Sequence, residues 1–181
     1  MGTYKKIKEN LLIRVDSNKE IGLGHILRVI RIFKNTKKNL HINFIVDHLN
    51  NNLIKIENLG NYTFRELYNK KEKFISQQHD AKKFINYIKK FNNPIVIVDD
   101  YRLDEKWQKK VKKYTKKLIV IDDLCNRKIY ADVYINYKTD INNNLLNKAK
   151  KLNKRGTELL VGNKYCILGK NLNKNLNKKK I

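Results

Sequence analysis

The sequence predicts an α/β fold in which an open, mostly parallel sheet is covered by helices on both faces. Apolar runs of strand length alternate with longer segments whose apolar residues recur every three or four positions. Two of the runs, Ile95 to Val98 and Leu118 to Ile121, have no alternating polar residues, which is typical of strands buried on both faces of a parallel sheet. Strands and helices that alternate in this way are joined by right-handed crossovers, which favours a single open sheet.

Strands are expected at the short apolar or β-branched runs. The first is Leu11 to Val15, which precedes a polar loop with two glycines, and the second is His41 to Asp47. Tyr62 to Leu67 is expected to form a short third strand. The two pure apolar runs supply the fourth and fifth strands, and the weaker run Val133 to Ile135 supplies another.

Helices are expected between these strands. The first begins near His25 and ends near Asn35, with one apolar stripe, and the second covers residues 49–59. The third and fourth are expected from stripes at helical spacing: Ala81, Phe84, Ile85, Ile88 and Phe91, and then Leu103, Trp107, Val111 and Tyr114. Pro94 ends the third helical segment, and acidic residues at the start of the fourth favour the helix dipole.

Polar residues follow four of the expected strands. In an open parallel sheet, ligands bind in a crevice at the carboxyl ends of the strands, so these residues should gather at one edge. They are Asp16 and Ser17, Asp47 and His48, Asp99 to Tyr101, and Asp122 with Asp123. Neighbouring residues point to opposite faces, so we expect one acid of each tandem pair to face the crevice. Tandem acids can bind a divalent cation but more often cap the next helix, and we assign no metal.

The stretch from Asn10 to Arg28 (NLLIRVDSNKEIGLGHILR) combines features that suit an anionic ligand. Gly22 and Gly24 allow close approach of the backbone, and the start of the following helix attracts negative charge. His25 lies at that helix start and can transfer a proton near neutral pH. The glycines match only part of the G-x-G-x-x-G dinucleotide fingerprint, because Leu27 takes the third position, so neither NAD nor FAD is expected.

Three segments together resemble a known enzyme family. Arg14 to Ser17 and then Ile21 to Arg28 resemble the R-x-D-x-S-x-x-I-G-x-G-H-x-x-R opening of the UDP-sugar hydrolases of pseudaminic acid biosynthesis, with a difference of one residue in the loop. Ile95 to Tyr101 resembles the I-I-D-x-Y stretch of that family, and Gly162 to Leu168 resembles its G-x-x-Y-x-x-L hinge. The resemblance implies a Rossmann-like domain equivalent to the amino-terminal half of a two-domain glycosyltransferase of the B type.

The resemblance also implies an activity and a set of site residues. These enzymes hydrolyse a UDP-linked deoxy-diacetamido sugar to the free sugar and UDP, with water attacking the anomeric carbon and without a metal or another cofactor. The resemblance implies that His25 is the general base. It also implies the following substrate-binding residues: Arg14, Asp16, Gly22, Gly24, Arg28 and Tyr101. Asp100 stands where the family often has histidine. Taken alone, His25 is compatible with polar surface, Asp16 with a loop or cap residue, and Tyr101 with packing.

The likeness covers the amino-terminal half of such an enzyme, and we place this domain at residues 1–169. Residues 170–181 are polar and basic, and are expected to form a low-complexity tail. The family holds its nucleotide mainly with a second domain, which this sequence lacks, so we expect weak or no hydrolysis by the isolated chain. A truncated or split gene product, a separate carboxy-terminal partner domain and a nonenzymatic sugar-binding module are all compatible with this organisation.

Composition limits the other classes of function. The 181 residues carry a formal net charge of +24, but the lysines are spread along the whole chain without a helix-turn-helix, zinc-finger or RNA-recognition motif. Specific nucleic-acid binding is therefore not expected, although salt-sensitive nonspecific binding is. No apolar run reaches the roughly 20 residues of a transmembrane helix, and the expected location is cytoplasmic. Cys125 and Cys166 form neither a disulfide framework nor a zinc site.

Overall fold

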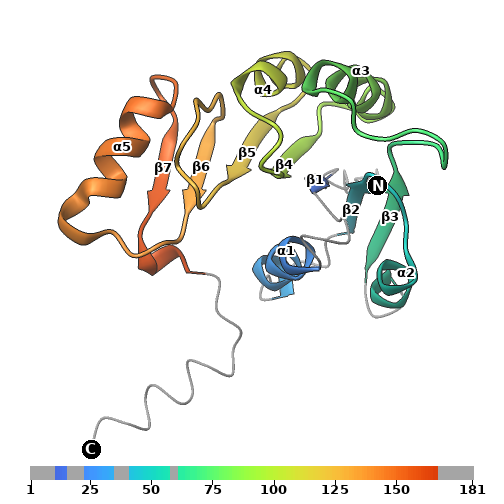
Figure 1. Ribbon diagram of the computed structural model, residues 1–181, viewed down its shortest axis with the longest axis horizontal. Coiled ribbons are helices and arrows are strands. Elements are labelled where there is room, and N and C mark those ends of the chain that lie inside the picture. Colours follow the sequence, from blue (N-terminus) through green and yellow to red (C-terminus); the bar gives the residue numbers. More distant parts are fainter. Residues whose placement is uncertain (1–10, 16–22, 35–40, 58–60, 167–181) are drawn as a thin grey trace, which may run out of the picture.

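The computed structural model describes residues 11–15, 23–34, 41–57 and 61–166 and has a Rossmann-like α/β fold (Figure 1). Its described strands form one open sheet, all parallel, in the order β3-β2-β1-β4-β5-β6-β7. The predicted fold class is confirmed. The strands are β1 (Leu11–Val15), β2 (Ile42–Val46), β3 (Tyr62–Glu66), β4 (Ile95–Asp99), β5 (Lys117–Ile121), β6 (Val133–Asn136) and β7 (Glu158–Val161).

The order of the strands reverses next to β1. This strand pairs with β2 on one side and with β4 on the other, and the register places Val15 beside Asp99. A parallel sheet opens a crevice at such a point, because the connections on either side leave in opposite directions. The carboxyl ends of β1 and β4 are therefore the place in this fold where a ligand site is expected.

The helices cover both faces of the sheet. They are α1 (Gly24–Lys34), α2 (Asn51–Glu57), α3 (Gln77–Ile88), α4 (Glu105–Lys112) and α5 (Asn144–Leu152). Buried residues of α1 and α2 pack with Ile13, Phe44 and Ile97 of the sheet. Those of α3, α4 and α5 pack with the alternate residues, such as Leu12 and Val96. Figure 1 shows α1 and α2 on one side of the central strands and α3 and α4 on the other.

The predicted elements differ from the observed ones mainly at their ends. Helix α4 begins only after Asp104, because the carboxylate of this N-cap residue accepts a hydrogen bond from the Lys106 amide at 2.8 Å. Helix α3 begins at Gln77, four residues before the predicted stripe, and Ser76 is its N-cap. Helix α5 and strand β7 were not predicted. The helix buries only Ala149 completely, and β7 is a half-buried edge strand, so both have weak apolar patterns.

Among the described residues, no helix has both the length and the apolar character needed to span a bilayer.

Candidate active site

The two acids that end β4 point to opposite faces of the sheet, as predicted for neighbours along a strand. Asp99 faces α1, where its side chain contacts His25 and Arg28. Asp100 faces α3 and α4, where Arg102 donates to it at 2.6 and 2.9 Å. Both carboxylates are buried and paired with arginine. Each of the two carboxylates therefore already has a cationic partner.

His25, the second residue of α1, is held against the end of β4. Its Nδ1 lies 2.9 Å from Oδ1 of Asp99 and 3.1 Å from the carbonyl oxygen of the same residue. The donor Nη2 of Arg28 lies 3.3 Å from the same nitrogen, but the two acceptors are closer, so the geometry favours the proton on Nδ1 and the lone pair on Nε2. The side chain is 10% exposed, and within the described residues Nε2 has no hydrogen-bond partner. The ring is thus fixed by one nitrogen, and the other is available to act as a base.

Arg28 lies one helical turn after His25 and binds the same carboxylate. Its Nε donates to Oδ2 of Asp99 at 2.8 Å and its Nη2 donates to Oδ1, which makes the pair bidentate. Arg28 also donates to the hydroxyl of Tyr137 and lies over that ring, 5.3 Å from its centroid. Asp99 is therefore shared between an imidazole and a guanidinium group, both supplied by α1.

Two tyrosines extend this cluster toward β5 and β6. The ring of Tyr101 contacts His25 edge to face, with centroids 4.9 Å apart. Its hydroxyl donates to Asp123, which also accepts from the hydroxyl of Tyr137 at 3.2 Å. These bonds connect the strand ends of β4, β5 and β6 in one hydrogen-bonded wall beside His25.

A pocket of about 300 Å³ lies next to this wall. It is lined by Gly24, His25, Arg28, Arg31, Tyr137 and Cys166. The pocket is open beside Gly24, since a Cβ added to it would have no described atom within 4 Å. The lining combines a base, two arginines and an aromatic ring, which is a set suited to a ligand with both sugar and phosphate groups.

The electrostatics of the cluster set its protonation states. Burial lowers the pKa of His25, but the hydrogen bond to Asp99 and its negative charge outweigh this, so the pKa lies above its ordinary value of 6.5. Burial and the bond to Asp123 raise the pKa of Tyr101, which keeps this hydroxyl protonated as a donor. The pKa of Asp123 lies below its usual range, because the bond from Tyr101 and the charge of Arg28 outweigh the effect of burial.

Arg14 lies on the other face of the sheet and is fully buried. Its guanidinium group donates to Asp47 and Asp80, both at 2.5 Å, and to the carbonyl oxygens of Val15 and Ile45. No exposed donor is left for a ligand. The predicted contact with substrate does not fit this placement, and we assign Arg14 a structural role.

The ion network around Arg14 joins the helices to the strand ends. Asp80 in the first turn of α3 also accepts from Tyr68 at 2.8 Å and from Trp107 of α4 at 2.7 Å. Asp47 at the end of β2 accepts from Arg102 at 2.7 and 3.1 Å. The negative charges of three carboxylates (Asp47, Asp80 and Asp100) are thus nearly balanced by the positive charges of two guanidinium groups (Arg14 and Arg102). This buried network ties α3 and α4 to β1, β2 and β4.

The predicted site residues are therefore brought together only in part. His25, Arg28 and Tyr101 lie in one cluster and Gly24 lines its pocket, whereas Arg14 lies on the opposite face. Asp16 and Gly22 fall outside the described residues.

Arg127 belongs to the site's surroundings and was not predicted. Its Nη1 donates to Asp122 at 3.0 Å, and its guanidinium lies over the Tyr101 ring, 5.6 Å from the centroid. Its Nε and Nη2 are buried and have no hydrogen-bond partner among the described residues. No motif surrounds Arg127 in the sequence, so only the fold of the loop after β5 could reveal it.

Comparison with known proteins adds no family to this description: neither a protein-family model nor a curated protein matches the chain.

Proposed function

We propose that this chain provides the catalytic face of a hydrolase that cleaves a UDP-linked deoxy-diacetamido sugar into the free sugar and UDP, with His25 as the general base. The observation that carries the proposal is the Asp99–His25 pair beside a pocket at the carboxyl ends of the central strands. The substrate class and the base both come from the sequence resemblance, and the geometry of the Asp99–His25 pair supports the base.

The pair suits His25 to remove a proton from water. Asp99 holds Nδ1–H and stabilises the imidazolium that forms when Nε2 takes the proton, as a carboxylate does in other acid–histidine pairs. The water oxygen then forms its bond to the anomeric carbon, and the bond from that carbon to the diphosphate oxygen breaks with its electron pair leaving on UDP. Water supplies both the hydroxyl of the free sugar and the proton held by His25.

Positive charge near the base supports departure of the diphosphate. Arg28 and Arg31 line the pocket, and the amino-terminal end of the eleven-residue helix α1 adds a partial positive charge. The charge of Arg28 is neutralised by Asp99. Arg31 is also the more exposed of the two arginines that line the pocket. We assign Arg31 to the diphosphate and the hydroxyl groups of Tyr101 and Tyr137 to orientation of the sugar or water.

Single-turnover assays with the chain in excess over the UDP-sugar test this proposal. We expect slow UDP release by the native chain and a loss of about 10²- to 10⁴-fold in His25→Ala, with binding retained in saturation-transfer NMR. Tyr114→Phe, a change on the opposite face of the sheet, is the matched control. UDP release that survives His25→Ala would refute the base. Binding without turnover would indicate the sugar-binding alternative, and absence of binding would refute the substrate class.

A further inference from the structure

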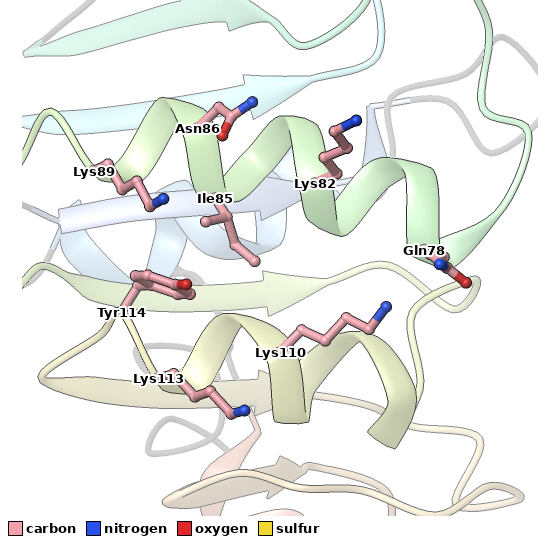
Figure 2. A pocket seen from close by; sticks show the side chains of 8 residues that line it. All are labelled: Gln78, Lys82, Ile85, Asn86, Lys89, Lys110, Lys113 and Tyr114. Carbon is pink, nitrogen blue, oxygen red and sulfur yellow. The ribbon is translucent and has the colours of Figure 1, made fainter.

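A second pocket lies between α3 and α4, on the face of the sheet opposite to α1. It has a volume of about 430 Å³ and is lined by Gln78, Lys82, Ile85, Asn86, Lys89, Lys110, Lys113 and Tyr114. The lining residues of α3 and its C-cap recur at helical spacing and form one stripe, whereas the other wall is Lys110 of α4, its C-cap Lys113 and the following Tyr114. Figure 2 shows Ile85 pointing into the space between the helices, with Lys89 and Tyr114 together at one end and Gln78 at the other. We call this feature the α3–α4 groove.

The charge of the α3–α4 groove is uncompensated. Its four lysines are exposed and make no ion pair within the described residues, and no carboxylate lines it. Other lysines of the same two helices are paired: Lys83 with Glu72, Lys109 with Glu105, and Lys112 with Asp132. Four lysines without an ion pair among the described residues thus line one groove, where their mutual repulsion favours binding of an anion.

An aromatic ring and two amides accompany this charge. The side chain of Tyr114 is 40% exposed, and Nζ of Lys89 lies 5.2 Å from its ring centroid. Ile85 provides an apolar floor, and the amides of Gln78 and Asn86 can donate and accept hydrogen bonds. A stacking surface beside ammonium groups in a concave site suits a phosphodiester strand with exposed bases. A flat anionic membrane would make poorer contact with a groove.

We propose that the α3–α4 groove binds single-stranded nucleic acid without regard to sequence. Lys82, Lys89, Lys110 and Lys113 contact the phosphates, and one base stacks on Tyr114. Such binding is independent of the hydrolase site, because the groove and His25 lie on opposite faces of the sheet. It also agrees with the absence of a sequence-specific recognition motif, since phosphate contacts and stacking carry little sequence information.

Fluorescence anisotropy with a labelled oligothymidylate of about 12 nucleotides tests the proposal, within the site sizes usual for single strands. The test variant replaces the four groove lysines with glutamine, and the control replaces four exposed lysines elsewhere: Lys55, Lys148, Lys150 and Lys151. Both variants have the same net charge. We expect the groove variant to lower the slope of log K against log salt by about 3, because each contact with a single strand contributes about 0.7. The control should retain most of the slope.

A Tyr114 series separates stacking from charge. Tyr114→Leu should weaken binding roughly 10-fold with an unchanged salt slope, and Tyr114→Phe should retain binding. Equal losses of slope in the groove and control variants would refute the proposal, since binding would then follow net charge alone. It would also be refuted if the groove lysines governed binding to phosphatidylserine vesicles and not to the oligonucleotide. Thermal unfolding of each variant checks that the fold is intact.

Discussion

Replacing Asp99 with asparagine should lower the pKa of His25. A carboxylate in contact with an imidazole favours the imidazolium form and so raises the pKa, and a difference of one pKa unit corresponds to about 1.4 kcal/mol. Asp99 contacts Nδ1 at 2.9 Å, and without its charge, burial and the positive charge of Arg28 lower the pKa of the ring against only the bond to the backbone carbonyl of residue 99. We therefore expect the titration midpoint of His25 to fall from above 6.5 in the native chain to below 6.5 in Asp99→Asn.

An NMR titration of the His25 ring protons measures this shift directly. Asp100→Asn is the control, because its carboxylate lies on the opposite face of the sheet and pairs with Arg102. It should leave the His25 midpoint unchanged. An unchanged or higher midpoint in Asp99→Asn would refute the assignment of Asp99 as the partner of His25.

The same pair determines how stability and activity change with pH. Because the folded-state pKa of His25 is raised, its protonation stabilises the native chain fully below the unfolded value of about 6.5, and this contribution is lost as pH rises through the folded pKa. In Asp99→Asn that loss should vanish or reverse. UDP release needs the neutral base, so its acidic limb should move to lower pH in the variant while the maximal rate falls by about 10²- to 10⁴-fold.

Three further substitutions test the remaining contacts. Arg14→Met should destabilise the fold by about 3–5 kcal/mol in urea unfolding, since it leaves the buried Asp80 without a cation and removes one of the two arginines of Asp47; a loss below about 1 kcal/mol would contradict the structural role. Asp104→Ala should cost about 1 kcal/mol in the same assay, because the α4 N-cap is lost, and Asp104→Asn should restore most of it. Arg127→Met should weaken UDP-sugar binding, because Nε and Nη2 have no partner among the described residues, and should also lower the melting temperature, because buried Asp122 loses its cation; unchanged affinity of the folded variant would exclude a role in binding.

The fold class could be predicted from the sequence because the central strands have a clear apolar pattern. β1, β4 and β5 are nearly continuous apolar runs, and their burial on both faces follows from composition alone. Helix α5 and β7 escaped prediction for the opposite reason: asparagine and lysine dilute their apolar positions, and contacts with the rest of the sheet stabilise them. Local pattern is weak wherever an element is only half buried.

The location of the candidate site could be predicted from the sequence, but the directions of its side chains could not. The rule that ligands bind at the carboxyl ends of parallel strands placed Asp99, Tyr101 and Asp123 near His25, and the structure brings them into one cluster. Tyr137 and Arg127 were not found, because they follow weak or irregular segments and reach the site only through tertiary folding.

Arg14 shows how register decides a residue's role. In β1, Ile13 and Val15 face α1, so Arg14 between them must face α3 and α4. The pairing of Arg14 with Val98 and of Val15 with Asp99 places Arg14 on the same face as Asp100, and its guanidinium group lies 4.0 Å from that carboxylate. His25 is held by Asp99 on the other face. A residue one position from the end of β1 therefore cannot share the His25 pocket unless the strand slips by one residue, which would turn its buried apolar residues to the wrong faces. In this chain, the arginine of the R-x-D segment secures the carboxyl end of β1.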